Sequence, residues 1–285
     1  MSYLSRIDHA FSDAPVLPLS ENGRYVLFSD CHRGIGTSND NFLKNQHLYF
    51  AALNYYYQHS FCYIELGDGD ELWENRSFSA IQNIHSNVFW LLSLFYEEHR
   101  LFMLFGNHDI AKKDFHPFSD CCFHEGLRLK DCVTGQELYL THGHQADFFN
   151  STLWRLSCFL VRYLWKPLEQ FGVLDPTSAA KNYKVKNKTE QRLQEWTKLH
   201  KKILITGHTH RPVLGSKDSL YFNTGSCVHP RCITCIELVH RELSLVKWTL
   251  STKPDRTLFV AREVLAGPVA VSYTHLRAHE TRSNL

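Results

Sequence analysis

Aspartate, asparagine and histidine recur in five short motifs along the chain. The motifs are Asp30-Cys31-His32, Gly67-Asp68, Gly106-Asn107-His108-Asp109, Thr141-His142-Gly143-His144 and Gly207-His208-Thr209-His210. In the spacings Asp-x-His and His-x-His, alternate residues lie on the same side of an extended loop, so both side chains can face one ion. Carboxylate, amide and imidazole groups without thiolates suit divalent first-row metal ions better than a structural zinc site. The motifs therefore predict a metal site.

Each motif follows a short apolar segment that is typical of a buried strand. These segments are residues 24–29, 62–66, 101–105, 138–141 and 203–206. Residues 42–59 and 81–98 have apolar side chains at helical spacing, and further strands are expected near 232–238 and 242–249. Alternating strands and helices predict an α/β fold with a covered sheet. Because ligands bind outside the carboxyl ends of strands in such sheets, we expect the five loops to converge in one cleft.

Seven side chains in these loops are candidate metal ligands: Asp30, His32, Asp68, Asn107, His142, His208 and His210. Seven donors are too many for one closed tetrahedral site and suit two ions that share a ligand. Asp68 is the candidate shared ligand, because a carboxylate bridges two ions better than an imidazole does. Two ions about 3.5–4 Å apart can activate a bridging water and stabilise the charge of a phosphoryl displacement. The ligand set therefore predicts phosphoester hydrolysis.

In this order the five motifs resemble those of the calcineurin-like metallophosphoesterase superfamily, over residues 24 to about 223. The resemblance implies a bacterial enzyme with a four-layer α/β/β/α sandwich and a dinuclear centre at its strand ends. It implies hydrolysis of a phosphomonoester, phosphodiester or pyrophosphate bond by a bridging hydroxide, with Mn²⁺ as the expected metal and Fe, Zn or Ni as alternatives. By the family pattern, one metal takes Asp30, His32, Asp68 and His210, and the other takes Asp68, Asn107, His142 and His208.

Further site residues follow from the same resemblance and from their position beside the ligands. His108 takes the role of protonating the leaving oxygen, with Asp109 as its orienting partner, and a histidine titrates near neutral pH as this role requires. Arg33 and Arg211 adjoin ligand loops and are candidates for binding phosphate, or are solvated arginines. His144 either contacts substrate or holds a ligand in its tautomer.

The pattern departs from two relatives within the superfamily. Its protein serine/threonine phosphatases continue the second motif as G-D-x-x-D-R-G and end the third in Glu, whereas this chain lacks that arginine and has Asp109. The bacterial UDP-2,3-diacylglucosamine hydrolases, which cleave a pyrophosphate in a nucleotide-linked lipid, share the extension Gly-His-Thr-His-Arg-Pro212 but carry G-N-R-D where this chain has His108. A pyrophosphatase of that type is the alternative function. A non-catalytic scaffold with this fold is a second alternative, although such a protein is expected to lack several ligands.

A helical insertion is expected at about residues 150–202, as a cap over the site. Apolar residues at helical spacing mark one helix over 153–171, which either packs in the core or forms an acyl pocket or a peripheral membrane contact. A basic helix is expected from about 177 to 202, as a solvated face that can steer an anionic substrate rather than a nucleic-acid groove. We therefore expect a phosphorylated small molecule or a nucleotide-linked compound as the partner.

The composition of the chain bears on its partners and on its location. Thirty-one Lys and Arg residues against 29 Asp and Glu residues give a formal charge of +2, which argues against nucleic-acid binding through a basic surface. The N-terminus lacks the apolar core of a signal peptide, and no uncharged apolar run reaches the roughly 18 residues of a membrane span. Nine cysteines in such a chain predict reduced thiols and a cytoplasmic location, with Cys232 and Cys235 as core thiols on one strand.

The last fifteen residues need separate treatment. Residues 271–281 read like a translated transposase sequencing adapter, so residues 271–285 are interpreted as a non-native tail. His275 and His279 have helical i, i+4 spacing, but they are excluded from the site with the rest of the tail. The expected domain organisation is a single metallophosphoesterase domain over residues 1–270.

Overall fold

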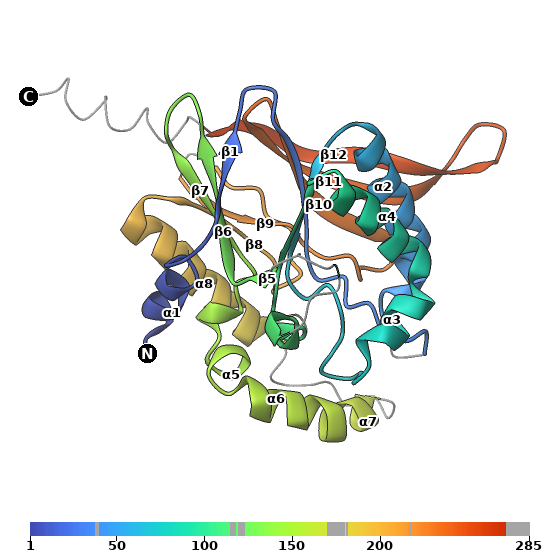
Figure 1. Ribbon diagram of the computed structural model, residues 1–285, viewed down its shortest axis with the longest axis horizontal. Coiled ribbons are helices and arrows are strands. Elements are labelled where there is room, and N and C mark those ends of the chain that lie inside the picture. The colour runs from blue at the N-terminus through green and yellow to red at the C-terminus, as the bar shows by residue number, and fades with distance from the viewer. Residues whose placement is uncertain are drawn as a thin grey trace, which may run out of the picture.

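Two β-sheets form the centre of the molecule in the computed structural model, which describes residues 1–37, 40–114, 118, 123–169, 180, 182–216 and 218–271 (Figure 1). The larger sheet has seven strands in the order β12-β11-β10-β2-β3-β4-β5. Their bounds are β2 (Arg24–Phe28), β3 (Cys62–Leu66), β4 (Leu101–Leu104), β5 (Phe123–His124), β10 (Cys232–Val239), β11 (Glu242–Thr252) and β12 (Leu258–Ala270). Strands β2, β3 and β4 are parallel, so their carboxyl ends lie at one edge of the sheet.

The smaller sheet has five strands in the order β1-β6-β7-β8-β9. Their bounds are β1 (Val16–Leu19), β6 (Gly126–Asp131), β7 (Glu137–Thr141), β8 (Ile203–Thr206) and β9 (Tyr221–Asn223). Strands β7, β8 and β9 are parallel to one another. Residues from both sheets, among them Leu27 and Ile64 of the larger and Leu140 and Ile205 of the smaller, form one buried cluster, so the sheets pack face to face.

Helices cover the outer face of each sheet. Helices α2 (Gln46–Gln58) and α4 (Ser86–Glu97) pack on the larger sheet in a second buried cluster. Helices α1 (Tyr3–His9) and α8 (Tyr183–His200) pack on the smaller sheet in a third, which contains Trp196 (Figure 1). Burying a large apolar side chain contributes about 1.5–3 kcal/mol, so these clusters hold the strands in place. The predicted mixed α/β class is confirmed.

The strands that precede the five motifs lie where the sequence predicts them, as β2, β3, β4, β7 and β8. The helix predicted over 42–59 begins with a 3₁₀ turn, η1 (Leu43–Asn45). The helix predicted over 81–98 is divided into α3 (Phe78–Ile84) and α4 at His85. At that residue the backbone leaves the helical region, and the buried imidazole Nε2 lies 3.0 Å from Asp40 Oδ2.

The predicted helical insertion consists of two parts with different positions. The first runs through α5 (Phe148–Ser151), α6 (Trp154–Leu160), the π-helical turn η4 (Val161–Trp165) and α7 (Lys166–Glu169) along one edge of the molecule (Figure 1). The second is α8, which belongs to the layer on the smaller sheet and does not form a cap. Residues 170–179, which the sequence assigns to this insertion, lie outside the described residues.

The C-terminal part of the chain is strand-like, as predicted. Cys232 and Cys235 lie on β10 as free thiols. Strand β12 forms the edge of the larger sheet, and Val271 after it is buried and donates its N–H to the Arg241 carbonyl at 2.9 Å. The rest of the predicted tail, residues 272–285, lies outside the described residues. None of the helices that the structure describes is both long and apolar enough to cross a membrane.

Candidate metal centre

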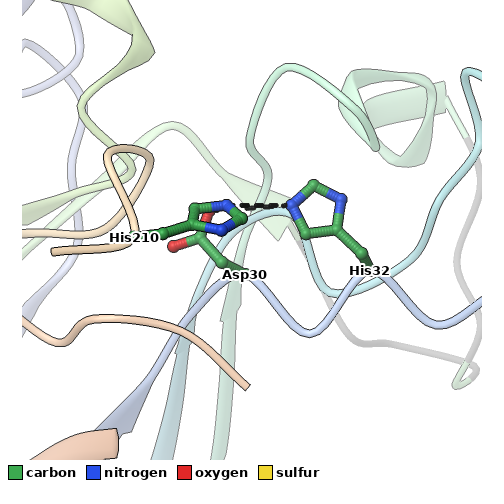
Figure 2. A group of neighbouring side chains, drawn as sticks. All are labelled: Asp30, His32 and His210. Atoms are coloured by element: carbon green, nitrogen blue, oxygen red, sulfur yellow. Dashed lines mark hydrogen bonds and ion pairs between the residues drawn. The ribbon is translucent and has the colours of Figure 1, made fainter. Parts of the chain in front are cut away.

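Six of the seven predicted ligands form two groups of three at the ends of β2, β3, β7 and β8. Asp30, His32 and His210 form one group, and Asp68, His142 and His208 form the other. Within each group the potential ligand atoms lie within 4.8 Å of one another. Figure 2 shows the first group, in which His210 Nε2 lies 3.1 Å from Asp30 Oδ1 and 3.3 Å from His32 Nε2. The predicted convergence of distant loops is therefore present in the structure.

Two carboxylates connect the groups. Asp68 Oδ2 lies 3.1 Å from His142 Nε2 in its own group and 3.8 Å from His32 Nε2 in the other. Asp30 Oδ1 lies 3.9 Å from the Nε2 atoms of both His32 and His142. The two groups therefore form one continuous set of donors, and Asp68 stands between them, where a shared ligand must lie.

Several donor atoms of this set are buried without a hydrogen-bond partner among the described residues. They are Asp30 Oδ1, Asn107 Oδ1, His142 Nε2 and His208 Nε2. A buried polar atom without a partner costs about 1–3 kcal/mol, and native structures rarely leave one in that state. Divalent cations at the two groups would satisfy Asp30 Oδ1, His142 Nε2 and His208 Nε2, whereas Asn107, the seventh predicted ligand, belongs to neither group. The donor set therefore fits a metal centre.

The tautomer of His142 and the low pKa of His210 also suit metal binding. His142 Nδ1 lies 2.8 Å from the Leu66 carbonyl oxygen, which can only accept, so the proton is on Nδ1 and the Nε2 lone pair faces the site. Burial lowers the pKa of His142, but Asp68 and Asp30 outweigh it and raise the pKa to about 9, so a metal ion that binds Nε2 must displace a proton. The same negative charge attracts a metal cation. Burial lowers the pKa of His210 to about 4, which keeps that imidazole in its neutral, metal-binding form.

Glu71 holds two imidazoles at once. Its Oε2 lies 2.8 Å from His32 Nδ1, and its Oε1 lies 2.8 Å from His108 Nδ1. The Trp73 ring stacks on His108 with the centroids 4.3 Å apart. Burial lowers the pKa of His108, but the carboxylates of Glu71 and Asp68 raise it to about 9. His108 therefore carries a proton near neutral pH, as a general acid must.

The predicted pairing of His108 with Asp109 is wrong, because Glu71 takes that place. Asp109 Oδ1 accepts the backbone N–H groups of Asp68 at 3.1 Å and of Gly106 at 2.7 Å. Its Oδ2 lies 2.7 Å from Lys112 Nζ. Asp109 thus ties the loop after β3 to the loop after β4. The sequence signal for Glu71 was a carboxylate three residues after Asp68 within a ligand loop.

Arg33 lies in a buried network of ion pairs and not in the predicted contact with phosphate. Arg33 Nε lies 2.7 Å from Asp70 Oδ1, and its Nη1 lies 2.8 Å from Glu65 Oε2. Lys112 Nζ lies 2.6 Å from Asp70 Oδ2, and all four side chains have no exposed surface. Because the carboxylates of Glu65 and Asp70 bind this guanidinium on two sides, Arg33 supports the loop that contains Asp70 and does not face substrate.

The two remaining predicted contacts are Arg211 and His144. The exposed Arg211 forms an ion pair with Glu190 of α8, and Thr209 Oγ1 donates to the same carboxylate at 2.9 Å. Buried His144 has its ring centroid 5.5 Å from that of His142, and its Nδ1 has no hydrogen-bond partner among the described residues. Both roles predicted for His144 stay open, and a substrate contact of Arg211 stays a prediction.

Comparison with known proteins assigns no family. No family model matches the chain, and no curated protein matches it. A solved structure of Vps29 from Chaetomium thermophilum is similar over 85% of this chain and 96% of that chain, with 12% sequence identity and a TM-score of 0.39. A likeness at this level carries no conclusion about function, so the site rests on its own geometry.

Proposed function

We propose that the chain is a metallophosphoesterase that hydrolyses a phosphomonoester, phosphodiester or pyrophosphate bond with two divalent ions, Mn²⁺ being the expected metal. Its two packed sheets with outer helices would be the sandwich of that superfamily, in one domain over residues 1–270. One observation carries the proposal. Asp30 and Asp68 join two ligand groups, of which Asp30 Oδ1, His142 Nε2 and His208 Nε2 are buried without a hydrogen-bond partner among the described residues.

The residues divide into metal ligands and a proton donor. Asp30, His32 and His210 would hold one ion, and Asp68, His142 and His208 the other, with Asp68 shared by both ions and Asn107 as a further ligand of the second. When bound, such ions activate water and neutralise the charge that develops on a phosphoryl group. His108 then donates a proton from Nε2 to the leaving oxygen, while Glu71 holds the proton on Nδ1. Trp73 covers one face of this imidazole and restricts its rotation.

The first test is metal-dependent hydrolysis of aryl phosphomonoesters, phosphodiesters and a pyrophosphate. We expect chelation to abolish turnover and Mn²⁺ to restore it. Asp68→Ala should lower kcat/KM by at least about 1000-fold, because it removes the shared ligand. Asp13→Ala, at an exposed carboxylate outside the site, is the matched control. Wild-type turnover in Asp68→Ala would contradict the proposal. Fewer than one bound ion per chain after loading would favour the non-catalytic scaffold.

A second candidate is a pyrophosphatase for a nucleotide-linked lipid, with a peripheral membrane contact. The observation that favours it is the apolar surface of α5 to α7. Exposed side chains on this segment are Phe148, Phe149, Leu156, Phe159, Tyr163 and Leu164. Residues 148–168 also contain no Asp or Glu, so no acidic side chain of this stretch repels an anionic lipid surface.

A pair of UDP-linked sugars, with and without acyl chains, separates the two candidates. A UDP-linked diacyl sugar should be cleaved at least about tenfold faster than the same UDP sugar without acyl chains if the apolar surface binds lipid. Phe159→Ser should remove this preference and lower binding to vesicles that contain anionic lipid. Equal rates for the two substrates would leave the general phosphoesterase as the function.

A further inference from the structure

The loop after β3 carries three side chains on which the proposed reaction depends. Asp68 is a proposed metal ligand, Glu71 binds the Nδ1 atoms of two imidazoles, and Trp73 stacks on His108. Leu72, between the last two, donates its N–H to the His108 carbonyl at 3.2 Å. A loop without regular structure must have its backbone carbonyls satisfied from outside when it is buried. The position of Glu71 and Trp73 therefore depends on whichever groups bind this backbone.

The segment from α6 to α7, almost ninety residues further along the chain, binds the backbone of this loop. Arg162 donates from Nε to the Trp73 carbonyl at 2.6 Å and from Nη2 to the Leu72 carbonyl at 3.0 Å. One turn later, Lys166 Nζ lies 2.9 Å from Glu74 Oε1, with both side chains mostly buried. Residues four apart share a helix face, so this face of the segment is the one that docks on the loop.

The local helix geometry around Arg162 is unusual. Arg162 lies in the π-helical turn η4, between α6 and α7. Turns of this kind are rare and are frequently found at functional sites. Tyr163, also in this turn, forms a hydrogen bond with Arg76 through its hydroxyl, and Cys158 Sγ lies 3.9 Å from the Trp73 carbonyl oxygen. The segment thus contacts the loop from Leu72 to Arg76.

We propose that Arg162 is a positioning residue for the hydrolysis proposed above, and this inference rests on that proposed function. By fixing the Leu72 and Trp73 carbonyls, its guanidinium keeps the Trp73 ring against His108. It also keeps the Glu71 carboxylate where it can bind the His108 imidazole. Arg162 acts through these two side chains and touches no reacting atom. The insertion thereby sets the geometry of the proton donor.

The test compares two methionine substitutions in one helical segment. Arg162→Met removes both donors and keeps the aliphatic part of the side chain. Arg155→Met is the matched control, because Arg155 is exposed and its guanidinium lies over the Trp154 ring, 5.4 Å from the centroid. Both variants of the full chain are loaded with Mn²⁺ and assayed on aryl phosphodiesters whose leaving groups differ in basicity. Arg162→Lys, which restores one donor, is the conservative variant.

We expect Arg162→Met to lower kcat by roughly 10- to 100-fold for the most basic leaving group, with KM changed less than about threefold. The loss should shrink as the leaving group becomes less basic, because a weakly basic oxygen needs little protonation. Arg162→Lys should recover part of the loss, and Arg155→Met should match the wild type. An equal kcat in the two methionine variants, or a loss independent of the leaving group, would overturn the proposal.

A second measurement does not need turnover. The imidazole Nδ1–H of His108 should give a ¹⁵N–¹H signal in the full chain, assigned by its loss in His108→Gln. We expect the signal to be lost by solvent exchange in Arg162→Met and to persist in Arg155→Met. An unchanged signal in Arg162→Met would refute the positioning role. If the wild type hydrolyses no phosphoester, the proposed function fails, and this signal alone decides whether Arg162 positions His108.

Discussion

Five of the proposed metal ligands have a backbone conformation that residues with a Cβ rarely adopt. Their φ angles are 54° at Asp30, 48° at His32, 51° at Asp68, 67° at His208 and 55° at His210. Each such residue costs about 1–3 kcal/mol and persists only where the surroundings hold it, most often at functional sites. In this chain the five residues lie in loops that belong to three separate motifs, and seven other non-glycine residues with positive φ lie elsewhere among the described residues.

Glycine allows these loops to approach one another. A Cβ on Gly106 would lie 2.2 Å from Asp68 Oδ1, and one on Gly207 would lie 2.4 Å from Asp30 Oδ2. Both contacts are far closer than real Cβ atoms allow, and both involve proposed ligands. The two glycines are therefore required by the position of the carboxylates.

Gly106→Ala should accordingly weaken metal binding. The methyl group must displace Asp68, so we expect Mn²⁺ affinity to fall at least about tenfold and the free energy of unfolding to fall by about 1–3 kcal/mol. Gly135→Ala is the control, since Gly135 has no atom near its Cβ position although its φ is +73°. Calorimetric titration with Mn²⁺ checks both variants. Equal affinities would show that Asp68 does not need the space beside Gly106.

The two parts of the insertion have different structural roles. Helix α8 buries Leu193 and Trp196 against the smaller sheet, and Trp196 Nε1 donates to Asp8 Oδ1 at 2.8 Å. The segment from α5 to α7 instead exposes much of its apolar surface and docks on one loop. The first part thus packs in the fold, and the second docks on the loop that contains Glu71 and Trp73.

Substitutions on α8 should therefore act on stability. Trp196→Ala removes a buried indole, so we expect the free energy of unfolding to fall by about 3–5 kcal/mol. Leu199→Ala, on the exposed side of the same helix, should change it by less than about 0.5 kcal/mol. Urea denaturation measures both. Similar small effects in the two variants would show that α8 is not a packed layer.

The two sheets are also joined by an ion pair at the end opposite to the site loops. Asp131, at the end of β6, accepts two hydrogen bonds from Arg241, which lies in the turn between β10 and β11, at 2.9 and 2.6 Å. Burial raises the pKa of Asp131, but its bonds to Arg241 and Thr134 outweigh burial, and the pKa lies below its ordinary value. The charged carboxylate therefore stabilises the folded chain.

This link predicts a dependence of stability on pH. Because the pKa of Asp131 is lower in the folded than in the unfolded chain, its contribution is present above the unfolded pKa of about 3.9 and is lost as pH falls through the folded value. Asp131→Asn should be less stable than the wild type at pH 6, and the difference should shrink below about pH 4. Asp13→Asn, at an exposed carboxylate, should show no such trend. Urea denaturation between pH 6 and pH 3 checks this.

Much of the fold and of the candidate ligand set could be predicted from the sequence, because these features depend on residues that are close together in the chain. An apolar segment that ends in Gly or Asp marks a buried strand wherever it packs, and β2, β3 and β4 lie where such segments are. Asp-x-His and His-x-His place two donors on one side of a loop by geometry alone. The division of the helix at His85 could not be predicted in this way, since it accompanies the contact with Asp40, 45 residues away.

The sequence by itself determined which side chains are candidate metal ligands and that their loops meet at strand ends. Tertiary structure alone decided which of the neighbouring charged residues face the site. Glu71 rather than Asp109 binds His108 Nδ1, and the buried Arg33 is bound by Glu65 and Asp70. The physical reason is that a charged side chain takes the partner that packing brings within about 3 Å, and sequence spacing does not specify that partner across separate loops.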